Sequence, residues 1–327
     1  MENKLSINEA MMTMPRQLFL YAYLIVPFLL AVALADMFYF NSYLLPHMGV
    51  EALFLLLYVF IFSLPHIIAS FFSFFSFFDT EYVRYYRKHL FLYLPLLLIG
   101  TAFLLYENYV LGLVFFLVND IWHGVRQKVG IALILGAKPG WLHRLWTLAP
   151  FVTASIAYVY VIRPNAYPDI LLPYVSPALF VGAIAMFVLM IAKIWTSPVT
   201  VRWYIFAVSM LFLVSYFFIL AGYIFFSILL FRFVHDVSAF AFYVTHDYNR
   251  KKNANKNFLY QLLTIVPLPF IILTPVLGLL FAYLVRTVTD GIAIGYSIII
   301  LICMSHFYLE SVMWKRDTPH RKYVKVV

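Results

Sequence analysis

The chain has 327 residues, of which 65% are hydrophobic and only 11% are charged. A soluble protein of this length needs far more charge to cover its surface, so the composition excludes an ordinary soluble enzyme. Long apolar runs recur from one end to the other, as in a polytopic α-helical membrane protein. The single cysteine, Cys303, excludes a disulfide within the chain and any cysteine-based zinc site.

We predict an all-α bundle of about ten transmembrane helices, because that number of segments approaches the length needed to cross hydrocarbon. The least clear division lies within 202–248, where Ala221-Gly222 is the only break. The whole chain, 1–327, is then a single integral-membrane domain, with the bundle at 17–314 and a basic cytoplasmic tail at 315–327. The predicted spans are 17–35, 51–78, 89–105, 108–127, 146–162, 172–196, 202–220, 223–248, 259–285 and 290–314.

Basic residues follow the even-numbered predicted helices, whereas acidic residues dominate the opposite loops. This alternation obeys the positive-inside rule and predicts that both termini are cytoplasmic, in a membrane of the bacterial inner-membrane type. It also accounts for the formal charge of +9, so we expect no nucleic-acid partner. The basic residues after even-numbered helices include Arg84, Arg87, Lys88, Arg126, Lys128, Arg202, Arg250, Lys251, Lys252, Lys315 and Arg316, and the opposite loops hold Asp36, Glu51, Glu107, Asp169 and Asp290.

Histidines on four predicted helices form the main candidate site. His66, His123, His235 and His306 lie on the second, fourth, eighth and tenth of these helices. All four helices run in the same direction, so their imidazoles are expected in the inner half of the membrane. Ionisable side chains inside a bilayer are costly and usually functional. We therefore predict that these histidines converge on one metal ion or on a pair of ions.

Polar neighbours share helical faces with these histidines. Asp120 precedes His123 by three residues and Gln127 follows it by four, while Glu310 follows His306 by four. A metal-binding imidazole normally donates its other nitrogen to a carboxylate or another acceptor. Asp120 and Glu310 are accordingly predicted as catalytic residues, acting as ligands or as groups that orient an imidazole.

Asp236 and His246 lie on the same predicted helix as His235. Asp236 adjoins His235, and it can instead form an i,i+4 salt bridge with Arg232. His246 follows His235 by eleven residues, about 16 Å along the helix, which is too far for both to bind one ion. With Gln127, these residues are candidates for a second site or for support of the first.

A nitrogen-rich site with some oxygen suits iron, with zinc, copper or manganese as further options. Three alternatives remain open at this stage. Membrane histidines also serve as hydrogen-bond partners between helices. A row of histidines and acids can conduct protons or metal ions in a transporter or channel. Two histidines, such as His66 and His235, can be the axial ligands of a haem.

The order of these motifs resembles the Brp/Blh-type membrane β-carotene dioxygenases. Leu64-Pro65-His66 resembles the family's first motif, His123 in IWHG the second and the His235 segment a third, and His306 with Glu310 resembles the last. The acid of the first motif is replaced by Ser70, and Ser305 stands in place of a proline before His306. The resemblance covers motif order over 60–315. It implies a polytopic membrane enzyme that uses iron.

Together, residues and resemblance favour a histidine-ligated membrane metalloenzyme, with His66, His123, His235 and His306 as ligands. Its expected activity is that of a non-haem iron oxygenase, or dioxygenase, that acts on a lipophilic substrate such as a carotenoid or lipid. Its expected partners are membrane lipids and that substrate. The sequence leaves the oligomeric state open.

Overall fold

The computed structural model describes residues 11–49, 57–73, 79–162, 168–251, 270–289 and 294–327. Within these ranges nearly all regular structure is helical, and the only sheet has two short strands. Seven of the described helices are long and apolar enough to cross a membrane, which indicates a multi-pass membrane protein. The prediction of a helical membrane bundle is therefore confirmed, while the count of ten crossings stays a prediction.

Most predicted spans correspond to described helices with slightly different bounds. The helices are α1 (Arg16–Tyr21), α2 (Ile25–Tyr39), α4 (Leu64–Ser73), α5 (Thr80–Lys88), α6 (Leu94–Glu107), α7 (Tyr109–Ile134), α8 (Trp141–Ile162), α9 (Leu172–Thr196), α10 (Val199–Leu220), α11 (Ile224–Lys251), α13 (Phe270–Thr289) and α14 (Gly295–Met313). Short 3₁₀ or π turns continue the helical path before α2, α4 and α6, at Ala22–Leu24, Val59–Ser63 and His89–Tyr93.

Three predicted spans are not among the seven apolar helices. The span 108–127 is α7, whose middle carries polar residues, among them Asn119 and His123. The spans 51–78 and 259–285 are described only in part, as α4 and α13, and their other residues lie outside the described ranges. Ten spans were predicted and seven described helices are long and apolar enough to cross a membrane. The polar residues of α7 and the partial description of the other two spans explain this difference.

Local sequence explains where several helices begin and end. The side chain of Asn108 accepts a hydrogen bond from the Leu111 backbone N–H at 3.0 Å and so caps α7. Asp79 caps α5 in the same way, through the Glu81 N–H at 3.1 Å. Between α10 and α11, Gly222 adopts a φ of +83°, which favours glycine. The break expected at Ala221-Gly222 is thus confirmed.

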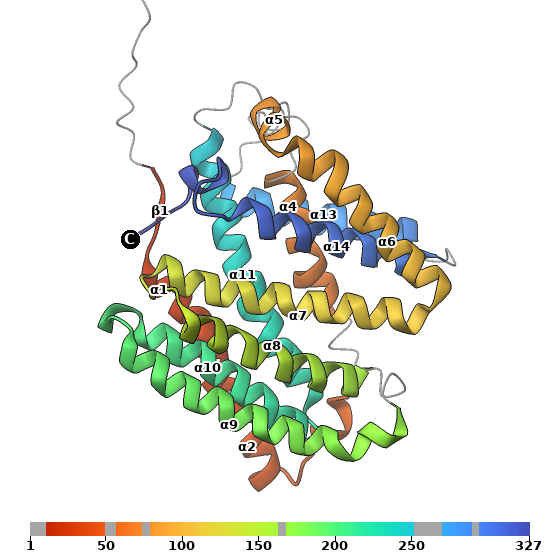
Figure 1. The fold of residues 1–327 in the computed structure, drawn as a ribbon, viewed down its shortest axis with the longest axis vertical. Helices are drawn as coiled ribbons and strands as arrows, with labels where there is room; N and C mark the ends of the chain where they lie inside the picture. Colours follow the sequence, from red (N-terminus) through yellow and green to blue (C-terminus); the bar gives the residue numbers. More distant parts are fainter. Residues whose placement is uncertain (1–10, 50–56, 74–78, 163–167, 252–269, 290–293) are drawn as a thin grey trace, which may run out of the picture.

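Helix α11 lies at the centre of the bundle and contacts α2, α4, α7, α10 and α13 (Figure 1). Helix α14 packs against α4, α6 and α7. Glycines allow two of these close approaches. A Cβ on Gly124 of α7 would lie 2.5 Å from the Phe231 ring of α11, and one on Gly278 of α13 would lie 2.5 Å from the Pro65 carbonyl oxygen of α4. These contacts bring the histidine-bearing helices together.

The basic segment at 315–327, predicted as a cytoplasmic tail, packs against the helices near the end of α11. Its strand β2 (Lys325–Val326) pairs in parallel with β1 (Thr13–Met14). The side chain of Asn249 ties the residues just before each strand to α11, because its amide donates to the Met12 carbonyl at 2.9 Å and to the Tyr323 carbonyl at 2.7 Å. His320 of this segment is 0% exposed and lies among aromatic side chains, whereas the basic side chains Lys315 and Arg316 are exposed.

The two ends of the bundle gather different segments, which permits a test of topology. Met12 and Tyr323 contact Asn249 near the end of α11, whereas Asp36 at the end of α2 accepts a hydrogen bond at 2.6 Å from Tyr223, which lies just before α11. We expect a cysteine introduced at Glu107 to be labelled only from outside the cell, and one at Asp317 only from inside, because of the distribution of basic residues. A membrane-impermeant thiol reagent applied to a Cys303→Ser background measures both. Labelling at 107 from the cytoplasmic side alone contradicts the topology.

Candidate metal centre

Four helices bring the four histidines to one buried point. His66 lies on α4, His123 on α7, His235 on α11 and His306 on α14, and their exposures are 0%, 8%, 3% and 0%. The rings of His66 and His123 each contact those of His235 and His306, with centroids 4.8 to 5.0 Å apart. Neighbouring rings are close to perpendicular, at 72° to 85°. The imidazoles thus form a ring of four, edge to face.

Three imidazole nitrogens converge within this ring. The Nε2 atom of His66 lies 3.2 Å from Nε2 of His235 and 3.3 Å from Nε2 of His306. Two nitrogens that bind one ion at about 2.1 Å, and at an angle of about 100°, lie about 3.2 Å apart. The observed spacing therefore fits a single small transition-metal ion.

A hydrogen bond behind the His306 ring and a carboxylate behind the His66 ring decide which nitrogens face the centre. The Ser70 hydroxyl donates to the Ile67 carbonyl at 2.5 Å, so its oxygen is left to accept from His306 Nδ1, 2.8 Å away. His66 Nδ1 lies 3.0 Å from Oδ1 of Asp236, which also accepts a hydrogen bond from Tyr58 through Oδ2. His306 Nδ1 thus carries hydrogen, and the carboxylate beside His66 Nδ1 favours a hydrogen there too, so that both Nε2 atoms present lone pairs to the centre.

This protonation pattern leaves no hydrogen between His66 Nε2 and His306 Nε2. Two lone pairs then face each other at 3.3 Å in a fully buried place, which is unfavourable unless a cation lies between them. A carboxylate beside the other nitrogen of a ligand, as Asp236 lies 3.0 Å from His66 Nδ1, is a usual companion of a metal-bound histidine. The donor set therefore fits a metal ion.

Glu310 contacts His123, although the sequence pattern paired it with His306. Its Oε2 lies 3.3 Å from Nε2 of His123, and the Tyr243 hydroxyl donates to its Oε1. Two triads have ligand atoms within 4.8 Å of one another: His66, His235 and His306, and His123, His306 and Glu310. His306 belongs to both and has only Nε2 free, because Nδ1 is bound to Ser70. One lone pair binds one ion, so the arrangement favours a single ion over a pair.

Asp120 is not placed as a ligand. It forms an ion pair with Arg232 of α11, whose guanidinium also contacts the Ser63 hydroxyl at 3.4 Å. The alternative i,i+4 pairing of Arg232 with Asp236 is wrong, because Asp236 turns to His66 and Tyr58 instead. Asp120 therefore compensates a buried cation beside the histidines and lies outside both triads.

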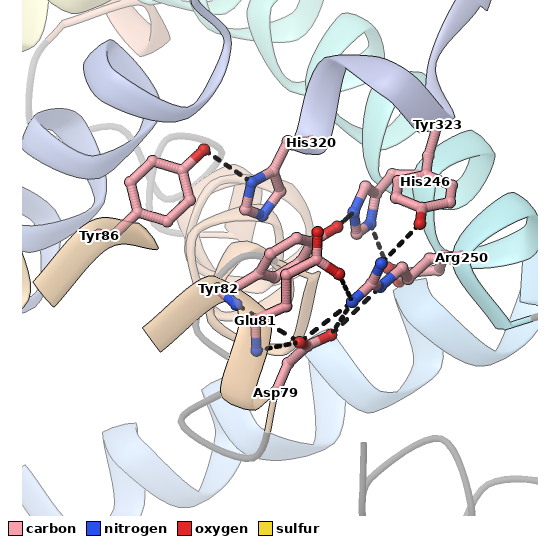
Figure 2. Close-up of polar contacts among 9 residues, drawn as sticks. Asp79, Glu81, Tyr82, Tyr86, His246, Arg250, His320 and Tyr323 are labelled. Atoms are coloured by element: carbon pink, nitrogen blue, oxygen red, sulfur yellow. Dashed lines mark hydrogen bonds and ion pairs between the residues drawn. The ribbon is translucent and has the colours of Figure 1, made fainter. Parts of the chain in front are cut away.

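The other candidate residues, Gln127 and His246, lie outside both triads. Gln127 lies one turn beyond His123, and its amide finds no hydrogen-bond partner among the described residues. His246 does not reach the four-histidine site and lies in a second polar cluster with Tyr82 and His320 (Figure 2). The expectation that His235 and His246 cannot share one ion agrees with these separate partners.

Several residues of the site carry no obvious motif in the sequence. Ser70, Tyr58 and Tyr243 each bond a histidine or its carboxylate from another helix. Lys128 is also buried, and its ammonium donates to the Phe231 carbonyl at 3.0 Å. Ser70 lies four residues after His66, on the same face, which is the only sequence hint among them.

Comparisons with known proteins add no assignment, since no family model, no curated protein and no solved structure matches this chain. What defines the molecule is thus its own geometry: a helical membrane protein with a buried histidine cluster that can hold a metal ion.

Proposed function

We propose that this protein is a membrane metalloenzyme, most specifically a non-haem iron oxygenase that acts on a lipophilic substrate. The observation that carries the proposal is the convergence of imidazole nitrogens whose lone pairs face one another around a buried point. Imidazole with one carboxylate suits iron, zinc or copper. Bound iron would supply the one-electron chemistry that dioxygen requires. The Brp/Blh-type resemblance supports this reaction class.

An apolar groove supports a lipophilic substrate. It has a volume of about 740 Å³ between α8 and α9, and its lining includes Val152, Thr153 and Gly182. Thr153 also lines an inner apolar cavity, which is bounded by Phe231 one turn before His235. A molecule that enters laterally from the bilayer would meet apolar side chains in this groove, as binding of a hydrocarbon chain requires.

Neighbouring side chains would fix the orientation of the metal ligands. Asp236 and Ser70 hold His66 and His306 in the tautomers that direct Nε2 to the centre. Tyr243 orients Glu310, and the surrounding helices exclude water. These positions would fix the ligand geometry before any substrate arrives.

The haem alternative fits this geometry poorly. Axial nitrogens on opposite faces of a haem iron lie about 4 Å apart with the macrocycle between them. The Nε2 atoms of His66 and His235 are 3.2 Å apart, and their rings are in edge contact.

The conduit alternative has one observation in its favour, namely ionisable groups at two depths of α11, around His235 and around His246. Iron reconstitution followed by oxygen uptake, with an unsaturated apolar chain such as a polyene as substrate, tests the enzyme. Proton flux in liposomes tests the conduit. Tight metal binding with substrate-dependent oxygen uptake supports the proposal, whereas flux without metal binding contradicts it.

Glu310→Gln is expected to weaken metal affinity or turnover about 10–100-fold without unfolding the protein. Glutamine keeps the shape and the contact with Tyr243 but loses the negative charge beside His123. A metal titration and a thermal unfolding curve measure the two effects. Glu107→Gln, at an exposed position at the end of α6, is the matched control. Unchanged affinity and turnover in Glu310→Gln would remove the carboxylate from the site.

A further inference from the structure

A second buried cluster lies where α5, α11 and the C-terminal segment meet (Figure 2). Its centre is a row of Asp247, His246 and Tyr82. The Asp247 Oδ1 atom lies 3.0 Å from His246 Nδ1, and the Tyr82 hydroxyl lies 2.7 Å from His246 Nε2. These residues are only 3%, 0% and 2% exposed. None of them belongs to the proposed metal centre.

Each hydrogen bond along this row has a definite donor and a definite acceptor. The Asp247 carboxylate accepts from His246 Nδ1–H, and its other oxygen accepts from the Thr274 hydroxyl at 3.2 Å. His246 Nε2 is then the acceptor, and the Tyr82 phenol donates to it. Tyr82 thus has a base in contact with its proton, and that base has a carboxylate to stabilise the imidazolium.

Arg250 holds the phenol ring in place. Its guanidinium lies over the Tyr82 ring at 4.6 Å and binds Asp79 with two nitrogens, the closest contact being 2.8 Å. The same group contacts Glu81 at 2.9 Å, so its charge is compensated by two carboxylates. A cation over the ring opposes a positively charged phenol. Oxidation of Tyr82 would therefore require loss of its proton, which His246 can accept.

Aromatic rings connect Tyr82 in two directions. Toward solvent, Tyr82, Tyr86 and Tyr85 follow one another at centroid separations of 6.5 and 4.8 Å, and Tyr85 is 55% exposed. The middle ring, Tyr86, has its own imidazole contact, since its hydroxyl lies 3.0 Å from Nδ1 of His320.

Toward the interior, the ring of His320 stacks on Tyr82 at 4.0 Å, and Trp314 contacts His320 at 6.3 Å. Trp314 follows Glu310 of the four-histidine site by four residues, and its backbone N–H donates to the Glu310 carbonyl at 3.4 Å. Rings in contact therefore extend from Trp314, one helical turn beyond that site, to the surface.

We propose that Tyr82 is a redox-active tyrosine that exchanges electrons between the interior site and the cytoplasmic surface. In the step, Tyr82 loses one electron to a one-electron oxidant, its O–H bond breaks, and the proton forms an N–H bond at His246 Nε2. The products are a neutral phenoxyl radical and an imidazolium beside Asp247. A one-electron reductant at the surface, of the ascorbate or thiol class, returns the electron through Tyr85 and Tyr86, and the proton returns from His246. The identity of the interior oxidant rests on the proposed function. The transfer of an electron and a proton from Tyr82 does not depend on it.

The test uses purified full-length protein without added metal and a photogenerated ruthenium(III) tris-bipyridine oxidant. After a flash and rapid freezing, electron paramagnetic resonance is expected to show a tyrosyl radical. Tyr82→Phe keeps the stacked ring and should lose most of the persistent signal, several-fold relative to wild type. Tyr106→Phe, at an 84% exposed position, is the matched control and should change little. An unchanged signal in Tyr82→Phe overturns the proposal.

Two further measurements make the assignment independent of any folding defect. Site-specific 3,5-difluorotyrosine at position 82 preserves the fold and should change the hyperfine pattern, so an unchanged spectrum means that the radical lies elsewhere and the proposal is wrong. His246→Gln can accept the hydrogen bond but cannot hold the proton. It should shorten the radical lifetime several-fold and abolish its dependence on D₂O, and wild-type values would exclude His246 as the acceptor. Because no metal is used, a failure here is distinct from a failure of the metalloenzyme proposal.

Discussion

His306→Ala is expected to lose nearly all bound metal, with an affinity loss on the order of 100-fold or more. Loss of a residue that merely orients a ligand already costs about 10–100-fold. His306 belongs to both triads and contributes a nitrogen 3.3 Å from that of His66, so alanine removes a donor that no described neighbour replaces. Elemental analysis of reconstituted protein gives the stoichiometry, and a competition titration gives the affinity.

His143→Ala provides the control for this loss. His143 is also buried, at 7% exposure on α8, but it lies outside both triads, so its truncation removes a similar volume without a ligand. It should retain wild-type metal content. If His306→Ala keeps full metal content while folding normally, helix α14 is structural and the proposed metal centre is wrong.

The sequence could predict the helices and the meeting of the histidines because both depend on strong one-dimensional patterns. Hydrocarbon thickness sets the length of apolar runs, and loop charges set their direction. A shared direction predicts a similar depth for these histidines, and the structure brings the four rings into contact. Partners that cross between helices leave no such pattern, which is why the bond from His306 to Ser70 could not be foreseen.

Charged partners show the same limit. Arg232 and Asp236 have the spacing of a salt bridge on one helix, yet Arg232 pairs with Asp120 from α7 and Asp236 with His66 from α4. A central helix is surrounded on all sides, so tertiary contacts compete successfully with contacts along its own face. His320 was missed for a related reason, because its basic segment resembles a solvated tail until β2 pairs with β1.

Ser70 links the sequence resemblance to the geometry. The motif that Leu64-Pro65-His66 resembles has an acid at the position of Ser70, and here the Ser70 hydroxyl accepts a hydrogen bond from His306. The carboxylate that faces His66 comes from Asp236 on α11. Each of these two rings thus has an oxygen close to its Nδ1 atom, at 2.8 Å for His306 and 3.0 Å for His66.

Arg232→Met is expected to lower the free energy of unfolding by about 3 kcal/mol, because it leaves the Asp120 carboxylate buried without its cation. The two side chains are 22% and 10% exposed, which places the expected cost at the lower end for a broken buried pair. Arg316→Met at an exposed position is the control and should stay within about 0.5 kcal/mol of wild type. Reversible unfolding of metal-free protein in mixed micelles measures the difference.

The double variant Asp120→Asn with Arg232→Met separates the ion pair from simple loss of packing. Asparagine removes the uncompensated charge, so the double variant should be more stable than Arg232→Met alone, with a coupling free energy of about 0.5–3 kcal/mol. Zero coupling would mean that Asp120 finds another partner when Arg232 is absent. With the expected coupling, Asp120 and Arg232 stabilise the contact between α7 and α11 that sets His123 against His235, and their role is to position these two imidazoles.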